Sequence, residues 1–263
     1  MSTDDSFNNP YAATQASLQE HPASGDFIPG GQSVSVSESL TWFGKGFAIF
    51  KSAPGQWIVA LIILVVLALL GALLNMIPFV GMFVTNLGMP VLLGGLMLGC
   101  QAADQGDGFK IDHLFAGFKA HFGPLVLVGL LYLAGIFMLA ILFGIVAVIG
   151  GVGIAAASSF SAIEQSWPIF LAVLLVLMLA FIPLAMAFYF APTLVVTQNL
   201  GPFDAMVQSF KGCLKNVLPF FVYFLVAGLL SLIAAIPLGL GFLVLGPMLF
   251  GATYASYKSI YLH

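Results

Sequence analysis

The stretch that decides the fold is KSAPGQWIVALIILVVLALLGALLNM, which occupies residues 51–76. It opens on Lys51, turns at Pro54 and then runs from Trp57 to Leu74 without one polar side chain. An α-helix needs about 20 consecutive apolar residues to cross the hydrocarbon core of a bilayer. The stretch therefore predicts a membrane-spanning helix over residues 55–76, with a positive charge at one end.

Five further stretches of the chain have the same apolar character. The expected spans are residues 80–103, 123–149, 168–197, 217–236 and 240–261. The chain has 263 residues, of which only 6% are charged, whereas a soluble domain carries roughly 25%. We therefore predict an all-α membrane bundle of six transmembrane helices in residues 40–263. Pro90 is expected to bend the second helix and Pro183 to kink the fourth.

The lysines predict the orientation of this bundle. The chain has no arginine, and its seven lysines are Lys45, Lys51, Lys110, Lys119, Lys211, Lys215 and Lys258. All seven lie in the gaps on one side of the expected spans, and the gaps at 75–81, 150–167 and 237–241 hold none. Lysine and arginine collect in cytoplasmic loops. The pattern indicates a multi-pass membrane protein with both termini in the cytoplasm.

Residues 1–39 differ from the rest in composition. They are polar and carry a charge of −5, whereas residues 40–263 carry +2. They contain neither the basic start nor the short apolar core of a cleavable signal peptide. We predict a disordered acidic cytoplasmic tail. Residues 40–53 alternate large apolar residues with Lys45 and Lys51, which predicts an amphipathic interfacial helix capped by Ser39 or Thr41.

An internal repeat is the second strong feature. DHLFAGFK (residues 112–119) and DAMVQSFK (residues 204–211) share Asp, Phe and Lys at identical spacing, and GFAIFK (residues 46–51) matches their second half. Pro90 and Pro247 occupy corresponding places in the helices that follow the first and third copies. The chain is thus expected to hold three units, each a short interfacial helix followed by a transmembrane hairpin. Units that each cross twice share one orientation and are related by an axis along the membrane normal.

Two contact sites follow from the charges and the tail. Anionic lipid headgroups are expected at Lys45, Lys51, Lys119, Lys211 and Lys215, at about 1 kcal/mol per residue. The alternative is that these lysines only set the topology. In the tail, Asn9-Pro10-Tyr11 combines a turn with an aromatic anchor and is a candidate docking segment for a cytoplasmic protein partner. No nucleic-acid partner is expected.

Small residues indicate where helices approach each other closely. Gly95 and Gly99 are four residues apart on the second expected helix, and Gly251 holds a corresponding place on the sixth. Such faces allow close helix contact. Packing within the chain is the favoured use, and a seam between copies of a homo-oligomer is the alternative.

Residues that carry chemistry are sparse. No ionisable side chain lies in the middle of an expected span, which disfavours a proton-coupled pump. Cys100, Asp104, His113 and His121 match no zinc spacing, and no nucleophile or phosphate-loop motif occurs. We therefore predict no catalytic residue, metal or cofactor, and no enzymatic activity. Cys100 and Cys213 are expected to be free thiols.

Several of these stretches also carry a resemblance. GGLMLGC (residues 94–100), the repeat at 112–119 and GPLVLVGLLY (residues 123–132) resemble a family of uncharacterised six-helix inner-membrane proteins of proteobacteria. APTLV (residues 191–195) and YASY (residues 254–257) fit it too, so the resemblance covers about residues 40–262. It implies a fold but no activity. More distantly, the three-hairpin plan resembles the non-catalytic membrane domain attached to some glycerophosphodiester phosphodiesterases.

Three functions remain open from the sequence. The favoured one is a non-enzymatic scaffold or accessory protein that contacts anionic lipid and a cytoplasmic partner. The second is a transporter or channel for a neutral or amphipathic solute, which requires a water-filled cavity lined by Asn86, Gln101 and Thr193. The third is a lipid-modifying enzyme, for which Cys100 and His113 are the only candidate residues.

Overall fold

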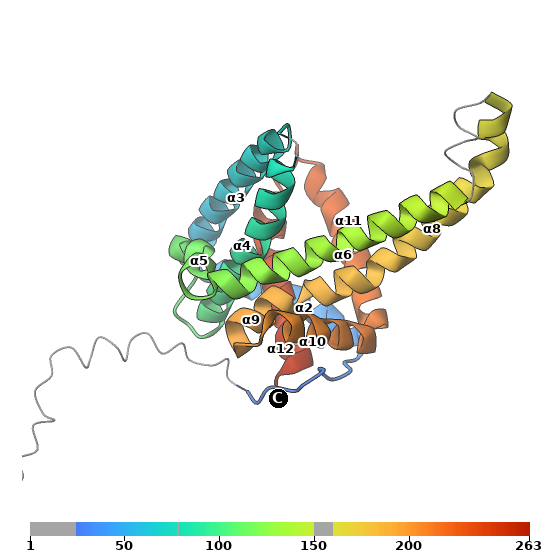
Figure 1. Ribbon diagram of the computed structural model, residues 1–263. Helices are drawn as coiled ribbons and strands as arrows, with labels where there is room; N and C mark the ends of the chain where they lie inside the picture. The colour runs from blue at the N-terminus through green and yellow to red at the C-terminus, as the bar shows by residue number, and fades with distance from the viewer. Residues whose placement is uncertain (1–24, 78, 150–159) are drawn as a thin grey trace, which may run out of the picture.

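The fold is all α-helical, as predicted (Figure 1). The computed structural model describes residues 25–77, 79–149 and 160–263. Its helices are α2 (Val36–Ser52), α3 (Pro54–Leu74), α4 (Val80–Asp104), the 3₁₀ helix η1 (Ile111–Phe115), α5 (Ala116–Ala120), α6 (Phe122–Ile149), α8 (Phe160–Tyr189), α9 (Ala191–Gln198), α10 (Pro202–Lys215), α11 (Val217–Ala235) and α12 (Phe242–Tyr261). Among the described residues, extended backbone pairs only at the isolated bridge between Phe27 and Leu262.

Five stretches of helix are long and apolar enough to cross a membrane in the described part of the chain. They are Pro54–Leu74, Val80–Asp104, Phe122–Val146, Leu174–Gln198 and Val217–Ala235. The sixth expected span corresponds to α12, which is not in this set. The first half of α12 is apolar, but its last eight residues contain Lys258, two serines and three tyrosines. Apolarity alone therefore identifies five spans rather than six.

The N-terminal boundary differs from the prediction. The Ser35 hydroxyl accepts the N–H of Glu38 at 3.2 Å, so α2 begins at Val36, and the expected caps Ser39 and Thr41 lie inside the helix. The expectation of disorder is wrong for residues 25–39. Residues 26–32 run alongside residues 260–263, and the N–H of Ile28 donates to the Tyr261 carbonyl at 2.8 Å. These backbone bonds order a segment that composition alone assigns to the tail.

The short helices gather at one end of the molecule. α2 packs on α12, η1 and α5 pack on α4, and α10 packs on α8 and α9. We use the name collar for α2, η1 with the loop 105–110 before it, α5, α10 and residues 25–35, together with the ends of α4, α9 and α12 on which they pack. The turns at 75–79 and 236–241 lie at the opposite end of the molecule (Figure 1). Each short helix thus packs on the second helix of a different hairpin from the one that it precedes.

Small residues permit two of these contacts. A Cβ on Gly46 of α2 would lie 2.3 Å from the carbonyl oxygen of Met248, and one on Gly117 of α5 would lie 2.2 Å from that of Val91. Met248 and Val91 each directly follow a proline inside their helix, Pro247 and Pro90. Corresponding contacts therefore join α2 to α12 and α5 to α4.

The third contact breaks a helix. The fourth expected span continues through Pro183 and is interrupted instead at Phe190, between α8 and α9. The Ser209 hydroxyl accepts the N–H of Phe190 at 2.9 Å and donates to the Met186 carbonyl at 2.6 Å. A side chain inserted into the i→i−4 ladder breaks a helix at that point. Pro183 does not end α8, and the interruption at Phe190 has its cause on α10 rather than in the span itself.

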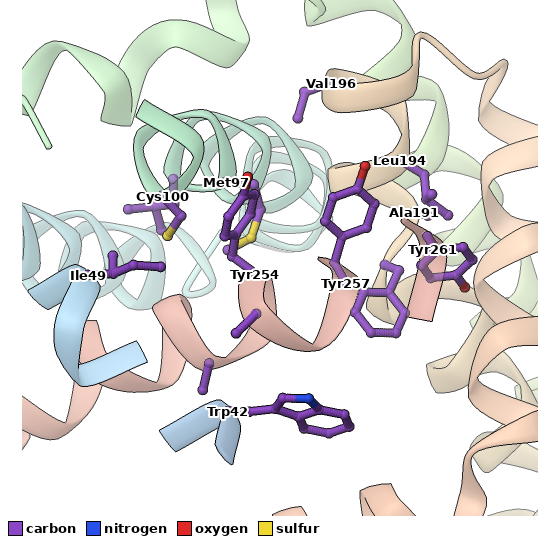
Figure 2. Packing of buried hydrophobic residues seen from close by; sticks show 14 of the residues in the cluster. Trp42, Ile49, Met97, Cys100, Ala191, Leu194, Val196, Tyr254, Tyr257 and Tyr261 are labelled. Atoms are coloured by element: carbon purple, nitrogen blue, oxygen red, sulfur yellow. The ribbon is translucent and has the colours of Figure 1, made fainter. Parts of the chain in front are cut away.

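The tightly packed core lies in the collar (Figure 2). Tyr254, Tyr257 and Tyr261 of α12 belong to it, with Met97 of α4 beside Tyr254 and Trp42 of α2 on the opposite side of α12. The hairpins outside the collar have few protein neighbours. The exposed fractions of Leu69 on α3, Met138 on α6 and Leu232 on α11 are 62%, 67% and 69%. The collar therefore holds the fold together, and the hairpins offer their apolar surface to lipid.

Candidate functional site at the helical collar

All the lysines lie in the collar. Lys45 and Lys51 are on α2, Lys110 directly precedes η1, Lys119 is on α5, Lys211 and Lys215 are on α10, and Lys258 is in the last turn of α12. The turns at 75–79 and 236–241 carry no lysine. The cationic residues that the sequence places in alternate gaps are thus brought to one end of the molecule.

Three of these lysines bind groups within the protein. Lys45 pairs with Glu38 at 2.7 Å. Lys258 pairs with Asp104 at 2.6 Å and so joins α12 to α4. Lys215 donates to the Gly31 carbonyl at 2.6 Å and holds residues 25–35 against α10. These lysines help to hold the collar together. Their positive charges are partly compensated within the protein and are less available to a ligand.

The other predicted lipid-contact lysines face outwards. The Lys51 ammonium lies 5.1 Å from the centre of the Phe47 ring, and both side chains are exposed. Lys119 and Lys211 are also exposed, and no ion pair forms at either within the described residues. Lys51, Lys119 and Lys211 are therefore the cations best placed to meet a charged headgroup.

A hydrogen-bond network joins the start of α2 to the end of α12. The Ser259 hydroxyl donates to the Glu38 carboxylate at 3.1 Å and accepts the indole N–H of Trp42 at 3.2 Å. The hydrogen bond from Lys45 to Glu38 is the main cause that holds the pKa of Glu38 below its ordinary value. The network forms one side of an open polar depression of about 480 Å³. Gly25, the first described residue, packs beside His263, which also lines this depression.

The predicted small-residue faces pack against other segments of the same chain. A Cβ on Gly95 would lie 2.5 Å from the His113 carbonyl oxygen, and one on Gly99 would lie 2.5 Å from the Phe109 ring. Both contacts are with η1 or the loop before it. Gly251 lies against Gly46, at 2.9 Å from the position of such a Cβ. The face of α4 that was also a candidate seam between copies is therefore covered by the protein itself.

The polar residues expected to line a transport cavity are packed instead. Thr193 and Gln101 have exposed fractions of only 2% and 7%. The side-chain amide of Asn86 donates to the Met82 carbonyl of its own helix at 2.8 Å. None of the three lines the polar depression. Their arrangement serves helix packing in the part of the chain that the structure describes.

The cysteine and histidine residues considered for metal binding or lipid chemistry do not come together as a set of metal ligands. Cys100 is buried in the core, and the His113 Nδ1 accepts the Lys110 N–H at 3.1 Å. Burial, aided by Lys110, lowers the pKa of His113. Across the described residues, no group of three or more histidine, cysteine or acidic side chains lies close enough to hold a metal ion. The tail residues Asn9, Pro10 and Tyr11 lie outside the described residues.

Sequence reasoning missed the buried tyrosine row. Tyr257 accepts hydrogen bonds from the Thr197 hydroxyl at 2.9 Å and the Gln198 amide at 2.6 Å. Tyr261 donates to the Gln208 carbonyl at 2.8 Å. The spacing Tyr254, Tyr257, Tyr261 places all three on one helix face. That pattern could have shown that the end of α12 is buried in protein rather than in lipid.

Comparison with known proteins supports a membrane location. The chain is similar to a probable inner membrane protein of Burkholderia thailandensis, with 27% identity over 230 residues that cover 84% of this chain and 82% of the relative. No family model matches the chain, and no solved structure matches it. Nothing in these comparisons supports the likeness to phosphodiesterase membrane domains. The five apolar helices and this similarity together support an integral protein of the inner membrane.

Proposed function

We propose that the protein is a non-enzymatic scaffold or accessory protein of the inner membrane. In this proposal the collar lies at the cytoplasmic face, and both termini are cytoplasmic. The collar contacts anionic lipid, and the tail recruits a protein partner. The main observation behind the proposal is that residues 25–35 are ordered. They hold the end of the tail that adjoins α2 against the collar.

Two features support this orientation. The collar holds all seven lysines, and retained positive charge marks the cytoplasmic side. The turns at 75–79 and 236–241 lie at the far end, so α3 with α4 and α11 with α12 would each cross the membrane and return. In this arrangement α12 is the sixth crossing, although the tyrosine-rich half of it lies in the collar.

The packing also supports a threefold repeat. Gly117 and Ser209 hold the same position in their Asp-x6-Lys segments, and each contacts a backbone carbonyl of the hairpin before it. α2 contacts the last hairpin through Gly46, which lies three residues before the position that Gly117 and Ser209 hold in their segments. A set of three units that closes on itself accounts for all three contacts. Such a ring presents its short helices together and suits a platform better than a mobile carrier.

The lipid contact follows from the exposed charges. Lys51, Lys119 and Lys211 lie on the short helices of three different units, and all three are exposed. Each lysine near an anionic surface contributes about 1 kcal/mol. The buried positions of Gln101 and Thr193 favour this platform over a solute transporter, which needs water at those residues.

The tail's role is tested by affinity capture from cells. Full-length protein, a variant lacking residues 1–24, Tyr11→Ala and the matched control Leu18→Ala are compared, and all four keep the ordered segment 25–35. We expect a partner that is captured by the full chain and by Leu18→Ala, and lost from the truncated chain and from Tyr11→Ala. An identical set of partners for all four proteins would contradict a role of the tail in binding a partner.

A further inference from the structure

Three adjoining phenylalanine rings lie exposed on the collar. Phe115 ends η1, Phe118 is on α5 and Phe122 begins α6, and their exposed fractions are 39%, 44% and 51%. The ring centres of Phe115 and Phe118 are 6.3 Å apart, and those of Phe118 and Phe122 are 5.9 Å apart. We call these three residues the phenylalanine row. Exposed apolar side chains that adjoin each other mark a contact surface.

Comparison of the three repeats shows that this exposure is particular to the second unit. Phe118 holds the same place in DHLFAGFK that Phe50 holds in GFAIFK, directly before the outward lysine. Phe50 is 7% exposed and belongs to the core, whereas Phe118 is 44% exposed. Phe210, in the third copy, is partly buried. Burial of a phenylalanine side chain contributes about 1.5–3 kcal/mol. A cover for Phe118 that supplies this free energy must come from outside the described part of the chain.

The neighbours of the phenylalanine row favour lipid as that cover. Phe122 is the first residue of the apolar stretch 122–146, so the row is continuous with a membrane span. Leu127, farther along the same helix, is 45% exposed. Lys119 lies within the row in sequence and is exposed too. Large apolar side chains beside lysine are typical of helices that lie in the membrane interface. A protein partner fits less well, because a stable protein interface uses about 20–30 residues on each side.

We propose that the phenylalanine row inserts into the boundary between the headgroups and the acyl chains of phospholipid and holds the second unit there. Lys119, beside the row, supplies a cation for the phosphate groups. The proposal deepens the lipid contact described under the proposed function and rests on the collar lying at the membrane surface. Insertion of the rings is an apolar contact and does not require an anionic headgroup. It can therefore hold or fail independently of the preference for anionic lipid and of the role of the tail.

Electron paramagnetic resonance of a nitroxide label tests this placement. Purified full-length protein is labelled at Phe118→Cys and reconstituted in bilayers of phosphatidylcholine, with and without phosphatidylglycerol. The label is probed with oxygen, which concentrates in hydrocarbon, and with a water-soluble nickel chelate. Asp107→Cys, in the exposed loop before η1, is the control for water, and Leu127→Cys is the control for lipid. The native thiols of Cys100 and Cys213 are buried and should take up little label.

We expect the ratio of oxygen to nickel accessibility at position 118 to lie near that at position 127 and well above that at position 107, in both bilayers. Phe122→Cys should give the same result and serves as a second label. A ratio at position 118 equal to that at position 107 would place the row in water and overturn the proposal. Low accessibility to both reagents would also overturn it, because protein, such as a second copy of the chain, would then cover the row. A ratio that rises only with phosphatidylglycerol would assign the contact to Lys119 rather than to the rings, and would contradict the proposal.

Discussion

The hydroxyl of Ser209 accepts the backbone N–H of Phe190 at 2.9 Å. The same hydroxyl donates to the carbonyl of Met186 at 2.6 Å, four residues before Phe190. One side chain of α10 thus replaces the helical hydrogen bond that would have joined α8 to α9. The same two hydrogen bonds therefore interrupt the helix between α8 and α9 and hold α10 against it.

Replacing Ser209 with alanine should destabilise the protein. Ser209→Ala leaves the Phe190 N–H and the Met186 carbonyl unpaired in a buried place, at a cost of about 1–3 kcal/mol. Ser231→Ala is the matched control, because its hydroxyl bonds only to the Ala227 carbonyl of its own helix. Thermal unfolding in detergent should show a clear fall in Tm for the first variant and little change for the second. Equal effects would mean that the bridge contributes nothing.

A methyl group on Gly46 should be poorly tolerated. The new Cβ of Gly46→Ala would lie 2.3 Å from the Met248 carbonyl oxygen, and the neighbouring backbone must move. Overpacking of this kind costs roughly 1–3 kcal/mol. Gly44→Ala on the same helix meets nothing within 4 Å and should instead stabilise by up to about 1 kcal/mol. Opposite shifts in Tm are expected, and a stable Gly46→Ala would contradict the packing of α2 on α12.

These two contacts show how far the sequence could lead. The membrane helices were predictable because an apolar run such as residues 57–74 is a local property. The break at Phe190 was not, because Ser209 lies 19 residues away and the bridge forms only after folding. Residues 25–35 were missed for the same reason, since their partners are at the other end of the chain. The lysines were found by their spacing, but their ion pairs with Glu38 and Asp104 were not.

Acid should weaken the network around Glu38. Its pKa is lowered in the folded protein, chiefly by Lys45, so the stabilisation is complete above the unfolded value near 4.5 and is lost as the pH falls below that value and through the lower folded one. The pair is partly exposed, so the effect is roughly 0.2–1 kcal/mol. Between pH 7 and about pH 3 the wild-type Tm should fall further than that of Glu38→Gln. Parallel falls in the two proteins would exclude Glu38 as a source of the pH dependence.

Removing the outward lysines should weaken the preference for anionic lipid. Lys119→Gln and Lys211→Gln each remove an exposed cation that has no ion pair within the described residues. Each change should lower the affinity for phosphatidylglycerol by about 1 kcal/mol, with no effect on the affinity for phosphatidylcholine. Native mass spectrometry of the purified variants measures both. Unchanged binding of phosphatidylglycerol in the double variant would mean that these lysines only determine the topology.

The side of the membrane on which the collar lies is the claim on which the proposed function depends, and thiol labelling in intact cells tests it most directly. The native thiol of Cys213 should react little with the label, because it is buried and burial raises its pKa to about 12. Lys211→Cys places a thiol on the collar, and Leu238→Cys places one in the opposite turn, where the side chain is 97% exposed. With a membrane-impermeant maleimide, we expect Leu238→Cys to be labelled in intact cells and Lys211→Cys only after lysis. Labelling of Lys211→Cys in intact cells would contradict the account.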